Sequence, residues 1–238
     1  MYHTVVMTCG ISLLRGRNLF SIDNGSRLAG LLTTSLQATE RTAEMKEELE
    51  RYFEQAKRYI DEIHDNPHSV SAEYSMIYTL LKNKKISKDL TIILIVTDTF
   101  GGDVCARLLC YIFEHVMGAN VKVLYSQMTV SNQKELNQQS AIFLRRLGDA
   151  LSQGDPTSTC FAPIGGYKVM TSLGYIVGSF LHYPMVYLHE EKQILVEIPP
   201  MPLDIDEEFV RVNNDLLRKC HRDLVSLNDL MYEEKQIV

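Results

Sequence analysis

The chain has 238 residues, of which 45% are hydrophobic and 23% are charged, and these proportions exclude a disordered chain or a fibrous repeat. The formal net charge of −6 argues against a protein that wraps long nucleic acid, because such proteins need a basic surface, but it is compatible with a small anionic ligand in a locally positive pocket. No apolar run approaches the roughly 20 residues that span a bilayer, so we expect no membrane contact and a cytoplasmic location.

The predicted elements alternate between strands and helices along the chain. Residues 2–8 are rich in β-branched side chains and predict a strand, and residues 37–65 place apolar side chains at helical spacing, with their charges on a solvated face. A helix from about Ser71 to Lys82 follows, with Ser69 or Ser71 as its cap. The later expected elements are strands at 91–97, 120–126, 158–164, 184–190 and 193–199, and helices at 103–117, 133–152 and 167–183.

This alternation predicts an α/β fold, namely a Rossmann-like, mostly parallel sheet flanked by helices. The short connection between the last two strands predicts a terminal β-hairpin. The proline-rich stretch 199–204 is followed by a short C-terminal helical tail. We therefore expect one domain over residues 1–200 and a helical extension over residues 201–238.

Three strand-to-helix junctions carry distinctive residues. In an open α/β sheet, ligands bind at the carboxyl ends of the strands, where glycine lets the backbone approach a ligand and helix N-termini present amide groups. The candidate ligand contacts are Thr8, Cys9, Gly10, Ile11 and Ser12 in the first loop, Asp98, Thr99, Gly101 and Gly102 in the second, and Gly165, Gly166, Tyr167 and Lys168 in the third. A single Gly-Gly pair can be a simple tight turn, whereas three such loops at one edge favour a phosphate-bearing ligand.

Several common sites are missing from the sequence. The first strand is not followed by GxGxxG, and the chain contains no GxxxxGK[ST]. Its five cysteines form no CxxC motif and are expected to be reduced and structural, so we expect no metal and no cofactor. Ser12 lacks the surroundings of a serine nucleophile and is expected to contact a phosphate or a hydroxyl. Asp103 is expected either to cap a helix or to contact the ligand.

With these loops in this order, residues 1 to 200 resemble the CARF-domain proteins of type III CRISPR systems, which sense cyclic oligoadenylates. The resemblance rests on Thr8-Cys9-Gly10-Ile11-Ser12, Ser71-Ala72-Glu73, Thr97-Asp98-Thr99 and Gly165-Gly166-Tyr167-Lys168. In that family the first turn commonly reads Thr-Val-Gly-Thr-Ser and the last loop Asn-x-Thr-Gly-Gly-Phe-Lys. Here Ile11 and Ile164 replace two hydroxyl side chains, and Ala162 stands in place of the asparagine.

The resemblance implies a homodimer that binds a cyclic oligoadenylate, with cyclic tetra-adenylate as the expected ring, because a two-fold dimer presents the same loops to both halves of a symmetric ligand. Some stand-alone members are ring nucleases, which switch off type III CRISPR signalling. In those enzymes a ribose 2′-hydroxyl attacks the neighbouring phosphate without a metal, and the product is linear with a 2′,3′-cyclic phosphate. By this resemblance Lys168 and Ser12 are the expected catalytic residues. Tyr167 is expected either to stack on adenine or to pack in the core beneath the sheet.

Two other hypotheses stay open. The chain could be a sensor that binds the ring without cleaving it and controls a separate effector protein, or a generic Rossmann-like binder of nucleotide phosphates. The tail carries no recognisable effector, because a HEPN ribonuclease needs an arginine and a histidine farther apart than Arg218 and His221. Absence of a visible effector favours a self-contained enzyme, unless the chain is a fragment or acts through a partner protein.

Overall fold

The computed structural model describes residues 1–15, 42–127, 133–166, 168–189 and 192–223. Its strands form one sheet of six in the order β3-β2-β1-β4-β5-β6. The strands are β1 (Tyr2–Thr8), β2 (Ile86–Thr97), β3 (Asn120–Ser126), β4 (Thr159–Pro163), β5 (Met185–His189) and β6 (Ile194–Ile198). All neighbouring pairs are parallel except β5 and β6, which are antiparallel. The predicted mostly parallel α/β sheet with a terminal hairpin is confirmed.

The helices follow the predicted order, with a few differences at their ends. They are α1 (Ser12–Arg15), α3 (Ala43–Ile63), α4 (Pro67–Val70), α5 (Ala72–Lys82), α6 (Phe100–Tyr111), η2 (Ile112–Val116), α7 (Gln133–Leu151), α8 (Lys168–Phe180), α9 (Glu207–Val212) and α10 (Asn214–Asp223). The short helix α4 was not predicted, although proline suits its first position. The predicted parts at 37–41 and 224–238 lie outside the described residues.

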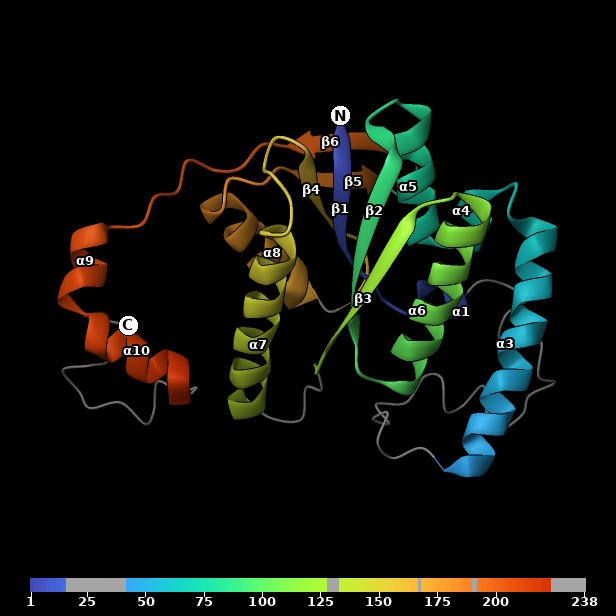
Figure 1. Ribbon diagram of the computed structural model, residues 1–238, viewed down its shortest axis with the longest axis horizontal. Coiled ribbons are helices and arrows are strands. Elements are labelled where there is room, and N and C mark those ends of the chain that lie inside the picture. Colours follow the sequence, from blue (N-terminus) through green and yellow to red (C-terminus); the bar gives the residue numbers. More distant parts are fainter. Residues whose placement is uncertain (16–41, 128–132, 167, 190–191, 224–238) are drawn as a thin grey trace.

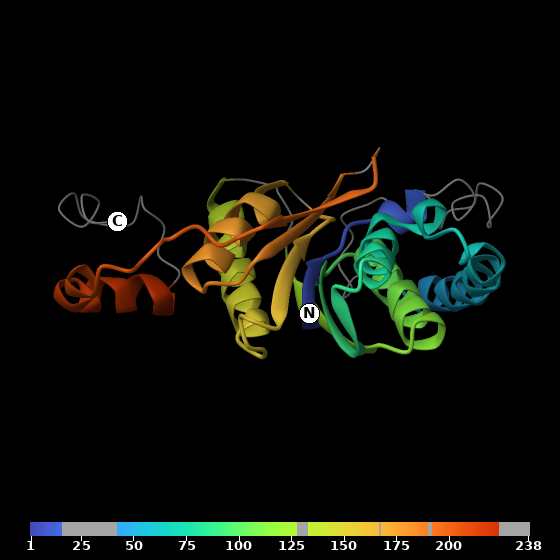
Figure 2. The ribbon, with the colours of Figure 1, turned by 90° about the horizontal axis from the view of Figure 1, so that it is seen from above.

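Successive side chains of the central strands point to opposite faces of the sheet and are buried on both. Val5 and Met7 belong to the core beneath α3, α5 and α6, whereas Val6 belongs to the core beneath α7 and α8. The same alternation separates Leu94 from Ile93 in β2. Helices cover both faces (Figures 1 and 2), which explains the continuous apolar run of β2.

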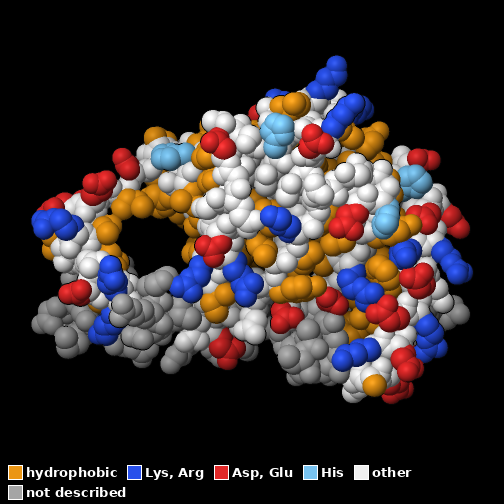
Figure 3. All heavy atoms as spheres, viewed as in Figure 1, with side chains coloured by type: hydrophobic (Ala, Val, Ile, Leu, Met, Phe, Trp, Pro, Cys, Tyr) orange, Lys and Arg blue, Asp and Glu red, His pale blue; other side chains and the backbone are white. Residues whose placement is uncertain are grey.

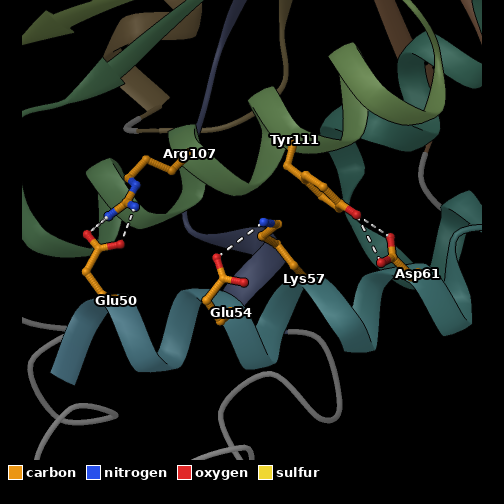
Figure 4. Close-up of polar contacts among 6 residues, drawn as sticks. All are labelled: Glu50, Glu54, Lys57, Asp61, Arg107 and Tyr111. Atoms are coloured by element: carbon orange, nitrogen blue, oxygen red, sulfur yellow. Dashed lines mark hydrogen bonds and ion pairs between the residues drawn. The ribbon is translucent and has the colours of Figure 1, made fainter. Parts of the chain in front are cut away.

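Helix α3 is attached to α6 by polar contacts (Figure 4). The guanidinium of Arg107 donates to both carboxylate oxygens of Glu50, at 2.8 and 2.9 Å. The hydroxyl of Tyr111 donates to Asp61 at 2.7 Å. Glu50 and Asp61 are exposed, as expected for charges on a solvated face, and in addition each of them contacts a second helix.

The C-terminal helices α9 and α10 lie at one end of the molecule, opposite α3 (Figure 1). Helix α9 buries none of its side chains, and Phe209 and Val212 are 41% and 66% exposed. In Figure 3 hydrophobic side chains border an opening between this tail and the body. The tail thus adds little to the core, which lies between the sheet and the helices that precede the tail.

Candidate functional site

The loops after β1, β2 and β4 open at the same edge of the sheet. The last residue of β1, Thr8, is in register with Ile95 of β2 on one side and with Pro163 of β4 on the other. The chain that follows β1 packs on the face of the sheet that α3, α5 and α6 cover. Helix α8 packs on the opposite face. This point, where the strand order reverses, is where open α/β sheets bind their ligands.

The first and third loops contact each other directly. The amide of Gly165 donates to the carbonyl oxygen of Thr8 at 3.0 Å. A Cβ atom at Gly10 would lie 2.8 Å from the amide nitrogen of Gly166. A Cβ atom at Gly165 would lie 2.0 Å from the amide nitrogen of Gly10. Gly166 itself has a φ of +94°, a conformation that favours glycine. These glycines were expected to let the backbone approach a ligand. In the structure they also let the first and third loops approach each other.

The carboxylate of Glu73, in the first turn of α5, binds the first loop from the protein interior. Its side chain is fully buried. One carboxylate oxygen accepts from the amide of Gly10 at 3.1 Å, and the other accepts from the hydroxyl of Ser12 at 2.6 Å. Charged groups are rarely buried unless hydrogen bonds compensate for lost water. Glu73 is thus a residue of the site that the sequence did not identify as such.

The expected role of the first loop changes with this contact. Gly10 is a candidate ligand contact, but its amide donates to Glu73. The hydroxyl proton of Ser12 is also directed at Glu73. The only signal in the sequence was the helix start Ser71-Ala72-Glu73, where Ser71 caps α5 by accepting from the amide of Tyr74 at 3.0 Å.

The remaining side chains of the first loop face the core. Thr8 is fully buried, and its hydroxyl has no hydrogen-bond partner among the described residues. Cys9 is 2% exposed, and burial together with the nearby Glu73 raises the pKa of its thiol. Ile11 is partly buried against the same core. These residues can meet a ligand mainly through their backbone.

The second loop is shorter than predicted, because α6 begins at Phe100 and its first turn contains Gly101 and Gly102, both buried. Thr99 is the N-cap, and its hydroxyl accepts from the amide of Gly102 at 3.1 Å. A Cβ atom at Gly102 would lie 2.2 Å from the carbonyl oxygen of Thr97, so glycine is needed there for packing.

The two acidic residues beside this turn have separate environments. Asp98 is half-buried, and its amide donates to the carbonyl oxygen of Ser126 at 3.1 Å. The cap role expected for Asp103 belongs to Thr99, and the carboxylate of Asp103 accepts from the hydroxyl of Tyr125 at 2.7 Å. Of the second loop, Asp98 and Thr99 lie outside the buried first turn of α6.

Lys168 is the first residue of α8, and its side chain is exposed. Its ammonium has no hydrogen bond or ion pair with any residue in the described part of the chain. A helix N-terminus carries a partial positive charge, so a cation in the first turn is disfavoured by roughly 0.3–1 kcal/mol unless an anion lies close. Tyr167, the predicted stacking residue, lies outside the described residues.

A cavity of about 180 Å³ adjoins the third loop. Its lining is His68, Ser71, Ala72, Ser75, Met76, Pro163, Ile164, Tyr187, Leu188 and Gln193. Within it the Nδ1 atom of His68 is hydrogen-bonded to the hydroxyl of Ser75, which donates to Oε1 of Gln193 at 3.1 Å. Three segments that are far apart in the chain form this cavity, so no local sequence pattern predicts it. Its volume is below the ~300 Å³ of pockets for drug-sized ligands, so it can hold one part of a larger ligand.

The described ranges contain neither a metal-binding cluster nor a membrane-spanning helix. No group of three or more His, Cys, Asp or Glu residues there could hold a metal ion. Among the helices of the same ranges, none combines the length and the hydropathy needed to cross a membrane.

Comparison with known proteins identifies a family that the chain matches. A family model described as "CRISPR-associated protein (Cas_APE2256)" matches residues 68–201, which is more than half of the sequence. The matched range runs from α4 to the end of the terminal hairpin and includes Glu73, the second loop and Lys168. A search of the curated proteins finds no match.

Proposed function

Because the chain belongs to this family of CRISPR-associated proteins, we propose that it binds a cyclic oligoadenylate at the edge formed by its three loops and cleaves it. The match agrees with the CRISPR family that the loops resemble. The observation on which the proposal depends is Lys168, an exposed cation without a described partner in the first turn of α8. This arrangement suits a phosphate of the ring.

The chemistry we propose needs no group beyond the protein and the ring. A ribose 2′-oxygen attacks the adjacent phosphorus, the bond from phosphorus to the 5′-oxygen breaks, and the electron pair leaves on that oxygen. The products are a 2′,3′-cyclic phosphate and a 5′-hydroxyl end. The ammonium of Lys168 and the first amides of α8 would stabilise the charge that develops on the phosphate oxygens, and the loops would orient the ribose.

A homodimer fits this proposal, because a two-fold axis would bring two copies of Lys168 to opposite sides of a symmetric ring. Each copy would contact one phosphate of the ring. We therefore include a two-fold dimer in the proposal, with cyclic tetra-adenylate as the preferred ring.

A non-catalytic sensor is the second candidate function, and one observation favours it. The amide of Gly10 and the hydroxyl proton of Ser12 are both engaged by Glu73. Fewer donors of the first loop are then available to stabilise developing negative charge. Such a protein would hold the ring and pass its bound state to a separate effector.

The test is incubation of the purified full chain with cyclic tetra- and hexa-adenylate in excess chelator, with products separated by chromatography and binding measured in parallel. Lys168→Ala is the test variant, and Lys88→Ala, an exposed lysine near the opposite end of β2, is the matched control. Cleavage that Lys168→Ala abolishes and Lys88→Ala retains would support a ring nuclease. Tight binding without turnover would support the sensor, and absence of binding would refute both.

A further inference from the structure

The hydroxyl of Ser12 has its proton committed to the protein interior. A serine hydroxyl carries one proton and two lone pairs, and an ionised carboxylate can only accept hydrogen bonds. The distance of 2.6 Å from Ser12 Oγ to Glu73 Oε2 is typical of a hydroxyl that donates to a charged carboxylate. The second oxygen, Oε1, already accepts from the amide of Gly10. Ser12 can therefore offer only lone pairs to a ligand.

We propose that Glu73 fixes Ser12 as a hydrogen-bond acceptor, so that Ser12 recognises a ribose 2′-hydroxyl and not a phosphate oxygen. Phosphate oxygens carry no proton at neutral pH and need a donor, which Ser12 cannot provide while it donates to Glu73. A 2′-hydroxyl is a donor and meets this requirement. This inference rests on the proposed function, because it assigns the ring's ribose to Ser12.

The same geometry provides a path for the proton that the attacking hydroxyl must lose. As the 2′-oxygen forms its bond to phosphorus, its proton moves to Ser12 Oγ, and the proton of Ser12 moves to Glu73 Oε2. The 5′-oxygen that leaves takes a proton from water, and Glu73 returns its proton to solvent through Ser12 after the product departs. Glu73 is thus a positioning residue that acts through Ser12.

The test reverses the polarity of Ser12 with little change in shape. In Glu73→Gln the amide oxygen still accepts from Gly10, but the amide nitrogen donates to Ser12 and turns the proton of Ser12 toward the ligand. We expect Glu73→Gln to bind cyclic tetra-adenylate roughly three- to tenfold more weakly than wild type, as for one lost hydrogen bond, and to cleave it at least ~100-fold more slowly, as for loss of a general base. Glu62→Gln, at an exposed position of α3, is the matched control and should behave as wild type.

A binding measurement tests the acceptor role apart from turnover. Wild type should bind the ribose ring roughly three- to tenfold more tightly than its 2′-deoxy analogue, as expected for one hydrogen bond. This preference should be lost in Ser12→Ala and in Glu73→Gln, and the double variant should be no worse than either single variant. Ser12→Ala keeps the test decisive if Glu73→Gln does not fold.

The possible outcomes separate this inference from the proposed function. A wild-type protein that binds both rings equally, or a Glu73→Gln variant that folds and cleaves at the wild-type rate, would overturn the inference and leave the ring-binding function standing. A protein that binds the ring without cleaving it, yet prefers the ribose form, would support the acceptor role. Failure of wild type to bind either ring would overturn the proposed function and this inference with it.

Discussion

Replacement of Gly165 with alanine should destabilise the fold strongly, because the new methyl group has no room. Its carbon would lie 2.0 Å from the amide nitrogen of Gly10, 2.6 Å from Oε1 of Glu73 and 2.8 Å from the carbonyl carbon of Cys9. Two of these three neighbours are backbone atoms, which cannot rotate away. The third is the buried carboxylate that joins the first loop to α5.

The magnitude follows from two effects. Overpacking of a close-packed interior costs about 1–3 kcal/mol. Displacement of Glu73 Oε1 weakens its hydrogen bond with the amide of Gly10, and a hydrogen bond to a charged group contributes about 1.5–3 kcal/mol. Together they predict that the free energy of unfolding falls by about 2.5–6 kcal/mol, which is a large part of the stability of an ordinary domain.

Urea unfolding followed by circular dichroism would measure this loss. The matched control is Gly148→Ala within α7, where the nearest atom to a new Cβ is Cδ1 of Leu181 at 3.9 Å. Alanine favours a helix interior over glycine, so the control should gain about 0.5–1 kcal/mol. A Gly165→Ala protein within about 0.5 kcal/mol of wild type would refute the proposed packing of the two loops on Glu73, because such a loss is smaller than overpacking alone.

Three further predictions concern the framework around the site. Thr99→Ala removes the N-cap of α6 and should lower the free energy of unfolding in urea by about 0.5–2 kcal/mol. A double-mutant cycle on Glu50, which is 61% exposed, and Arg107, which is 32% exposed, should give a coupling of only about 0.2–1 kcal/mol. Burial raises the pKa of the Cys110 thiol from 9.0 to about 11, so the unfolded chain loses its proton first and stability should fall as pH rises through this window. Urea titrations across that range should show a smaller fall in Cys110→Ala, and an equal fall would contradict the assignment.

The strands could be predicted from the sequence where their residues are continuously buried. The first part of β2 could not be predicted. The apolar run 91–97 indicated a strand, but β2 begins at Ile86. Between the pairs Tyr2–Ile86 and Thr4–Thr91 the register of β1 and β2 shifts. This irregularity interrupts the regular alternation of side chains, so the exposed polar residues within it gave no strand pattern.

The position of the site could be predicted from the sequence, but the hydrogen bonds within it could not. Strand ends followed by glycine placed the three loops at one edge through a general rule of parallel sheets. Glu73, in contrast, lies 61 and 63 residues from its partners Ser12 and Gly10. Acidic residues are common in the first turn of a helix, where they favour the helix dipole, so the local pattern already had an ordinary explanation. Only the fold reveals that this carboxylate faces inward.

The glycines of the three loops have separate structural reasons, which changes what supports a phosphate ligand. Gly102 makes room for the carbonyl oxygen of Thr97, whereas Gly10 and Gly165 make room for each other. Because packing accounts for each of these positions, richness in glycine is weak support for an anion site. The stronger support is the charge of Lys168, which has no partner in the described ranges and lies at the positive end of α8. Ring nuclease and sensor share this cation, and both are compatible with Ser12 as an acceptor, so turnover of the bound ring is the measurement that separates them.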